Sequence, residues 1–326
     1  MEKSNRLDYL DIAKGIGIIL VVLAHVYAFN PEISVSRGKL VTWIYSFHMP
    51  LFFIISGMLI RYKNKIDFKK TIFSRMKGIL VPYLFFSLVS VFIFALLADF
   101  EKGVIKELFR VTILGIGIET LWFLPALFFS DIIFTMMKKI VKNDYVIGVI
   151  IAILFFVSSF VTAENRMLLR FFARGLVALT FIYIGYMLFE IVQKRNIDNK
   201  FLIGILIVQI ITSHLNGFVD LNNLVFNNKI LYLFNSVLGS YILIEICKKI
   251  KSKSLIYLGK NSLIIMWLHL DLIFLFREYV GMNIYQYGIG LIATIVIILI
   301  EIPVIEIINR YLPFIIGRWY KKKICS

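Results

Sequence analysis

Long apolar segments dominate the chain, and each is about as long as a helix that crosses a lipid bilayer. Of the 326 residues, 60% are hydrophobic, whereas an ordinary soluble chain has about 45–50%. A membrane-spanning helix uses about 20 mainly apolar residues. We therefore predict an all-α integral membrane protein, a bundle of about ten transmembrane helices that forms a single domain over residues 1–326, with no separate soluble domain. The ten predicted spans are 11–29, 41–60, 79–98, 119–137, 145–162, 168–191, 201–216, 230–247, 255–276 and 284–311.

Lys and Arg are concentrated in alternate loops between these spans. Both chain ends and the loops 61–78, 138–144, 192–200 and 248–254 hold more than twice as many basic residues as the opposite loops, among them 99–110. Cytoplasmic loops carry such an excess. We therefore predict a multi-pass protein of the cell membrane with cytoplasmic N- and C-termini. The net charge of +16 is explained by this orientation, and no nucleic-acid partner is expected.

Cysteine usage gives no sign of a disulfide framework or a metal site. Cys247 and Cys325 are the two cysteines of the chain, and on the predicted topology both lie on the reducing, cytoplasmic side. Their spacing matches no paired metal motif, and no other spacing in the chain requires a metal. We assign them no role.

The first predicted span carries three polar side chains, Asp11, Lys14 and His25. An ionisable group inside a membrane costs several kcal/mol unless it is paired or faces a cavity, so each is a candidate for function. Lys14 and His25 are eleven residues apart, which places them on one helix face and separates them by about 16 Å along the axis. On the predicted topology, Lys14 lies near the cytoplasm and His25 near the outside.

Other polar residues are predicted to lie in the same outward half of the membrane. His48 falls near the external end of the second span, and Glu119 begins the fourth. A neutral imidazole oriented by a carboxylate is a competent general base. We predict His25 as the base, with Glu119 and His48 beside it; the alternative is that these histidines only form interhelical hydrogen bonds. Five further residues are expected to contact substrate: Asp11, Trp122, Arg170, Arg174 and His269.

A dense basic cluster is predicted at the inner side. The loop 61–78 contains seven basic residues and one acidic residue, Asp67, and its Arg75 and Lys77 lead into the third span. This density exceeds what membrane orientation needs. Together with Lys14 it suits a polyphosphate ligand, while anionic lipid head groups or topology alone are the alternatives.

Five segments together resemble the membrane-bound acyltransferase-3 family, whose members are O-acyltransferases that modify bacterial surface polysaccharides and related glycans. They run in the family's order from residue 6 to about 270, which is nearly the whole chain. In many relatives the basic residue of the first helix is Arg, where this chain has Lys14. The segments are Asp11-Ile-Ala-Lys14-Gly15-Ile with His25, Phe47-His48-Met49-Pro50, Arg75 before Pro82-Tyr83, Leu121-Trp122-Phe123-Leu124-Pro125, and Asn261-Ser262-Leu with His269.

The resemblance implies transfer of an acyl group, acetyl before others, from cytoplasmic acyl-CoA to a hydroxyl of a polysaccharide or lipid-linked glycan. Lys14, Arg75 and Lys77 would then hold the diphosphate of the co-substrate acyl-CoA, and no resident cofactor is expected. His25 would deprotonate the acceptor hydroxyl, Glu119 would fix the imidazole, and His48 or an amide would stabilise the oxyanion. An acyl-enzyme intermediate on His25 or Ser56 is the alternative to direct transfer.

Transport is the competing function class. Ten spans with buried charges could move a glycan or an acyl-bearing substrate by alternating access, with Asp11 and the histidines as a proton relay. The sequence shows no inverted repeat and no matching pair of spans broken by Gly or Pro, and this weakens the transport alternative.

Overall fold

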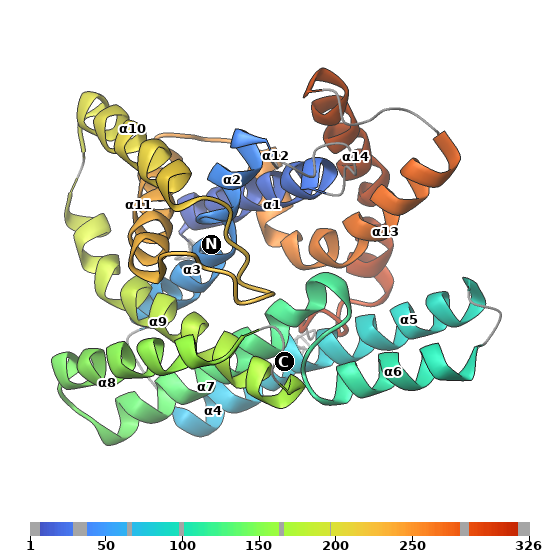
Figure 1. Cartoon of the computed structure of the whole chain (residues 1–326), viewed down its shortest axis with the longest axis horizontal. Helices are drawn as coiled ribbons and strands as arrows, with labels where there is room; N and C mark the ends of the chain where they lie inside the picture. Colours follow the sequence, from blue (N-terminus) through green and yellow to red (C-terminus); the bar gives the residue numbers. More distant parts are fainter. Residues whose placement is uncertain are drawn as a thin grey trace, which may run out of the picture. The chain divides into compact units, whose positions relative to one another are not determined.

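The computed structural model describes residues 7–28, 38–63, 67–97, 101–162, 166–195, 197–280 and 287–318. These residues are almost entirely helical and contain no strand, only one isolated β-bridge between Asp220 and Val225. The all-α prediction is therefore confirmed (Figure 1). Both chain ends, including Cys325, lie outside the described residues, so the predicted orientation of the termini stays a prediction.

The α-helices are α1 (Asp8–Ala28), α2 (Lys39–Tyr45), α3 (His48–Lys63), α4 (Phe68–Arg75), α5 (Val81–Leu97), α6 (Lys102–Ile113), α7 (Phe123–Ile140), α8 (Asp144–Val157), α9 (Met167–Lys194), α10 (Asn199–Asn216), α11 (Lys229–Cys247), α12 (Lys253–Lys260), α13 (Ser262–Val280) and α14 (Tyr287–Tyr311). A π-helical turn, η2 (Met76–Leu80), joins α4 to α5. Two 3₁₀ turns, η3 (Glu119–Trp122) and η4 (Ser158–Phe160), precede α7 and follow α8.

Seven helical segments within the described ranges are long and apolar enough to cross a membrane, and the pair α12 and α13 would make an eighth. In the described part of the chain, each of the ten predicted spans is largely helical. However, α8 and α10, which correspond to the predicted spans 145–162 and 201–216, are not among the seven. The seven segments are Asp8–Ala28, Lys39–Lys63, Phe68–Leu96, Glu119–Ile140, Met167–Lys194, Lys229–Cys247 and Ile289–Tyr311. The chain is thus a multi-pass membrane protein, and ten spans stay a prediction.

The predicted outer loop 99–110 contains a helix, α6, from Lys102 onward, which the sequence did not predict. Val104, Leu108 and Val111 recur at intervals of three and four residues and are half-buried, because α6 packs against α5. This is the spacing of an amphipathic helix. The hydroxyl of Tyr83 on α5 donates a hydrogen bond of 2.7 Å to the last turns of α6. Figure 1 shows the two helices side by side.

The predicted continuous span 255–276 is broken, and that prediction was wrong. α12 and α13 meet at Asn261 with a bend of 79°. Asn261 is 4% exposed, and its side-chain Nδ2 donates a hydrogen bond of 2.9 Å to the carbonyl of Tyr257. A short amide side chain that bonds the preceding turn competes with the helical ladder, and this is a known cause of sharp bends.

The chain packs as two compact units, which we describe separately. Unit 1 comprises Met1–Asn64 and Thr180–Glu301, and unit 2 comprises Lys65–Leu179 and Ile302–Ser326. Unit 1 therefore holds α1 to α3 and α10 to α13, with parts of α9 and α14. Unit 2 holds α4 to α8 and the remaining parts of α9 and α14.

Glycines allow helices of unit 1 to touch along their backbones. A Cβ on Gly57 of α3 would lie 2.0 Å from the carbonyl oxygen of Ile182 on α9. Conversely, a Cβ on Gly185 of α9 would lie 2.0 Å from the carbonyl oxygen of Ile54 on α3. Only glycine fits at either position, so the two helices cross in backbone contact, as small residues permit in membrane proteins.

Glycines also allow α1 and α12 to touch along their backbones. A Cβ on Gly15 would lie 2.2 Å from the carbonyl oxygen of Leu255, and one on Gly259 would lie 1.8 Å from the carbonyl oxygen of Asp11. The short helix α12, set off by the bend at Asn261, therefore lies directly against the N-terminal part of α1. This packing fixes the end of α1 that carries Lys14.

Candidate functional site

Three of the four histidines of the chain meet within unit 1, on α1, α3 and α13. Nδ1 of His25 lies 2.8 Å from Nε2 of His269, with the two ring planes 14° apart. The ring of His48 stands at 88° to that of His25, with 6.5 Å between centroids. His48 and His269 are 4% and 0% exposed, and His25 is half-buried. The structure thus brings the predicted base together with two other predicted site residues.

Hydrogen bonds to backbone carbonyls fix the protons of the neutral histidine pair. Nδ1 of His269 lies 2.8 Å from the carbonyl oxygen of Ile265. Because a carbonyl only accepts hydrogen bonds, Nδ1 of His269 carries the proton, and its Nε2 is left as an acceptor. Nδ1 of His25 is then the donor between the rings, and Nε2 of His25 carries the lone pair. A lone pair on that nitrogen is what a general base requires.

His48 has the same backbone arrangement. Its Nδ1 lies 3.0 Å from the carbonyl oxygen of Ile44, so the proton of the neutral ring is on Nδ1. The Nε2 of neutral His48 is therefore an acceptor. An oxyanion needs a donor, so the role predicted for His48 requires its protonated form.

Tyr45 completes this cluster, although the sequence analysis did not single it out. It ends α2, three residues before His48, and its ring centroid lies 4.8 Å from that of His48 and 6.0 Å from that of His25. On the other side it contacts Phe218, at 5.0 Å between centroids. A phenolic hydroxyl can donate as well as accept. Its position just before the Phe47-His48-Met49-Pro50 segment is the sequence feature that could have identified it.

A buried polar network holds the α2–α3 junction that carries Tyr45 and His48. The side-chain oxygen of Gln209 on α10 accepts a hydrogen bond of 2.5 Å from the indole of Trp43, and its nitrogen donates one of 3.0 Å to the hydroxyl of Ser46. The hydroxyl of Ser236 on α11 donates to the carbonyl of Ser46 at 2.8 Å. Gln209 and Ser236 are both 0% exposed. The junction is therefore fixed by two neighbouring helices.

The N-terminal part of α1 carries an ion pair. Nζ of Lys14 lies 2.7 Å from Oδ1 of Asp11, with the two side chains 22% and 5% exposed. Because α1 is continuous, Lys14 and His25 share a face and are about 16 Å apart along the helix axis. Between them on that face, Ile18 and Val21 are 0% and 1% exposed. This stretch of α1 is packed, so a path for a thioester would be lined by other residues.

In unit 2, a tight loop presents Glu119. Its backbone has φ +49, a left-handed conformation that is uncommon for residues other than glycine and costs of order 1–3 kcal/mol. Gly117 has φ +79, and a Cβ there would lie 2.3 Å from the backbone nitrogen of Trp122. Arg174 donates a hydrogen bond of 3.0 Å to the carbonyl of Ile116, and its guanidinium lies 5.6 Å from the Trp122 ring. Trp122 and Arg174 are 6% and 2% exposed and stabilise this loop.

Glu119 and His25 belong to different units, so their predicted pairing is not a contact within either unit. Within unit 1, the nitrogen of His25 that a carboxylate was expected to bind is hydrogen-bonded to His269. The histidine on α13 therefore orients the imidazole in this structure.

The predicted phosphate-binding residues of unit 2 have intramolecular partners. Nε of Arg75 lies 2.9 Å from Oδ2 of Asp131, a carboxylate that is 0% exposed. Nζ of Lys77 lies 4.2 Å from the ring centroid of Phe73. Arg170, which was predicted to contact substrate, is half-buried on α9. Asp131 was missed by the sequence analysis, although an acidic residue inside the apolar run 119–137 was signal enough.

The sequence analysis also missed two further buried carboxylates, Glu245 and Glu301, although each lies inside a predicted apolar span. Glu245 is 1% exposed and pairs with Lys248 at 3.1 Å. Glu301 is 0% exposed, and neither of its carboxylate oxygens bonds to another of the described residues. No group of three or more His, Cys, Asp or Glu side chains in the described part of the chain could hold a metal ion.

The all-helical architecture, the apolar spans and the imidazole pair inside unit 1 define a multi-pass membrane protein with a polar site buried among its helices. A family model described as an acyltransferase domain, of the acyltransferase-3 type, matches residues 7–301. The chain therefore belongs to the acyltransferase-3 family, as its motifs predicted, and is a membrane acyltransferase. Neither the curated proteins nor the solved structures contain a match.

Proposed function

We propose that this protein is an O-acyltransferase of the plasma membrane. It takes an acyl group, acetyl before others, from cytoplasmic acyl-CoA and transfers it to a hydroxyl of a cell-surface polysaccharide or lipid-linked glycan. Membership of the family supports acyl transfer. The observation that carries the mechanism is the hydrogen bond of 2.8 Å from Nδ1 of His25 to Nε2 of His269.

His25 acts as the general base. Its Nε2 accepts the proton of the acceptor hydroxyl while the hydroxyl oxygen attacks the thioester carbonyl carbon. The new carbon–oxygen bond forms, the carbon–sulfur bond breaks, and the proton passes to the CoA thiolate to give the free thiol. General-base catalysis of this kind contributes about 10²–10⁴-fold. His269 keeps the reactive nitrogen in its unprotonated form and stabilises the imidazolium through its own lone pair.

The carbonyl oxygen becomes an oxyanion during the attack and needs a donor. We assign this role to Tyr45. Its ring packs beside those of His48 and His25, and its hydroxyl can donate a hydrogen bond. Protonated His48 is the second candidate. A single oxyanion donor contributes about 10²–10³-fold.

The acyl-CoA diphosphate would bind at Lys14, Arg75 and Lys77. The ion pair with Asp131 supports this role for Arg75. Asp131 binds Nε and thereby fixes the direction of the guanidinium. Lys14 is partly exposed at the inner part of α1, where Asp11 holds it. Asp11, Trp122, Arg170, Arg174 and His269 remain proposed substrate-side residues, with His269 acting through His25.

The test is a transfer assay with purified protein in nanodiscs. Labelled acetyl-CoA and an extracellular polysaccharide are supplied, and both free CoA thiol and labelled polysaccharide are measured. We expect both products from the wild type and about 10²–10⁴-fold slower formation of both from His25→Ala at equal expression. A transporter would release no CoA thiol, and full activity of His25→Ala would remove the base assignment.

A further inference from the structure

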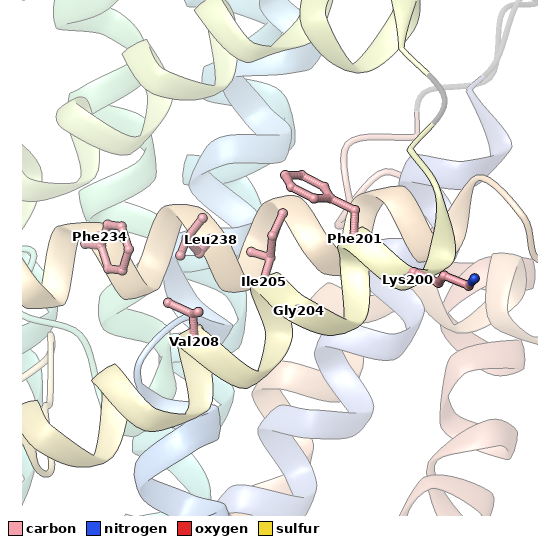
Figure 2. Close-up of a pocket in the computed structure, with 7 residues that line it drawn as sticks. All are labelled: Lys200, Phe201, Gly204, Ile205, Val208, Phe234 and Leu238. Atoms are coloured by element: carbon pink, nitrogen blue, oxygen red, sulfur yellow. The ribbon is translucent and has the colours of Figure 1, made fainter.

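A groove runs between α10 and α11 in unit 1. Figure 2 shows its lining side chains, with Lys200 at one end and Phe234 at the other. Its volume is about 480 Å³, and all the surrounding side chains except Lys200 are apolar. The lining residues are Lys200, Phe201, Gly204, Ile205 and Val208 on α10, with Phe234 and Leu238 on α11.

Gly204 contributes open space to the groove. A Cβ on Gly204 would meet nothing within 4 Å, so this glycine opens space instead of permitting helix contact. Farther along, Thr212 on α10 and Asn235 on α11 are hydrogen-bonded at 2.5 Å and hold the helices together. The groove is open at its side, because Phe201 and Phe234 are 61% and 42% exposed. With α10 placed in the membrane, as the sequence predicts for 201–216, this open side faces hydrocarbon.

The basic end of the groove matches a lipid headgroup. Lys200 stands in the first turn of α10, in the loop region 192–200 that the charge distribution places at the cytoplasm. Lys249 adds a second positive charge at this end, since its Nζ donates a hydrogen bond of 2.9 Å to the carbonyl of Ile197. Anionic lipids are concentrated in the cytoplasmic leaflet and attract basic residues near its surface.

We propose that this groove binds one hydrocarbon chain of an anionic phospholipid, with the lipid phosphate paired to Lys200. The chain fills the space beside Gly204 and contacts Phe201 and Phe234. An apolar wall alone would not select a particular lipid, because lipid tails are as apolar as the lining side chains. The selectivity therefore comes from the lysine and from the shape of the groove.

Lipid bound in the groove would also regulate acyl transfer. This consequence rests on the proposed function. Val208, which lines the groove, precedes Gln209, the residue that holds the α2–α3 junction through Trp43 and Ser46. A lipid in the groove stabilises α10 in the position that this junction needs. Lipid binding would therefore raise turnover through the placement of Tyr45 and His48.

Native mass spectrometry of the whole protein tests the site without any measurement of acyl transfer. Protein is released from nanodiscs that contain equal amounts of phosphatidylglycerol and phosphatidylcholine. We expect the wild type to retain phosphatidylglycerol, Gly204→Phe to retain about tenfold less, and Lys200→Gln to lose the preference over phosphatidylcholine. Lys200→Arg should keep it. Ile207→Phe is the matched control, because Ile207 is 52% exposed on α10 but does not line the groove.

Two results would overturn the lipid site. One is equal retention of both lipids by the wild type, and the other is unchanged phosphatidylglycerol retention by folded Gly204→Phe. If Gly204→Phe does not fold, Gly204→Leu takes its place, because the space at Gly204 also admits the smaller side chain. The regulatory consequence is tested by CoA-thiol release as phosphatidylglycerol is added. If the wild type binds this lipid but its turnover number does not change, the regulation alone is overturned. If no CoA thiol is released under any condition, the proposed function is contradicted.

Discussion

His25 donates its Nδ1 proton to Nε2 of His269 across 2.8 Å, although 244 residues separate the two in the chain. The backbone of α13 sets this direction, because Nδ1 of His269 is already bonded to the carbonyl of Ile265. One backbone carbonyl thus determines, through two imidazoles, which nitrogen of His25 carries a lone pair. The pair behaves as a unit, and its members should be tested together.

Replacing His269 by Ala should lower the turnover number of acyl transfer by about 10–100-fold, with little change in the KM for acyl-CoA. The imidazole of His25 would lose its orienting partner, and a fixed tautomer matters to a general base. The measurement is CoA-thiol release at saturating acceptor, beside His25→Ala.

The double variant His25→Ala/His269→Ala provides the control. We expect it to be no slower than His25→Ala, because residues that act through one another are not additive. Losses that multiply would show that His269 acts independently of His25.

Replacing Glu119 by Gly should stabilise the loop of unit 2 while lowering activity. Glu119 has φ +49, where glycine has no steric penalty, so the gain in stability is of order 1 kcal/mol. Thermal unfolding in detergent and CoA release are measured together. Glu119→Asn, which also tolerates this conformation, separates the backbone from the charge. A more stable Glu119→Gly variant with full activity would show that the carboxylate has no catalytic task.

Replacing Asp131 by Asn should raise the KM for acyl-CoA more than it lowers the turnover number. Arg75 would lose the charged partner that holds its Nε at 2.9 Å, and its guanidinium would no longer be fixed. Asp131→Ala should also destabilise unit 2, by about 1–3 kcal/mol. In Arg75→Ala/Asp131→Ala this loss should be smaller than the sum of the single losses. A turnover defect with an unchanged KM would argue against a phosphate role for Arg75.

Gly57→Ala should lower the unfolding temperature markedly, whereas Gly204→Ala should not. The added Cβ at Gly57 would lie 2.0 Å from a backbone oxygen of α9, and overpacking costs about 1–3 kcal/mol or more. At Gly204 the same methyl group meets nothing within 4 Å, and Ala is the better helix former by about 0.5–1 kcal/mol. Thermal unfolding of the two variants in one detergent compares them directly, and equal losses would contradict the packing.

Gln209→Leu should reduce acyl transfer about tenfold while the protein still folds. The variant keeps the volume of the side chain but leaves the indole of Trp43 without its acceptor and removes the donor to the hydroxyl of Ser46, so the α2–α3 junction loosens. Thr212→Val is the control, since it removes a hydrogen bond from the same helix away from the junction. A normal turnover number for Gln209→Leu would show that the junction is held without the network.

The sequence by itself determined the class of protein, the helical runs and the family. Apolar length is a local property of the chain, and it predicted the membrane helices directly. The excess of Lys and Arg predicted their orientation, which stays a prediction. Neither α6 nor the bend beside Asn261 was predicted from such local properties. There the outcome depends on a packing partner, α5, and on one side chain that bonds the turn before it.

Only the tertiary structure decided how the polar side chains are used. His25 and His48 were predicted as neighbours from their depth in the membrane, but depth does not say which group faces which nitrogen. The approach of α13 to α1 gave His25 its partner, and the pairing of Arg75 with Asp131 was equally out of reach. Such contacts join residues far apart in the chain. They depend on how each helix is rotated about its axis, and packing against neighbouring helices sets that rotation.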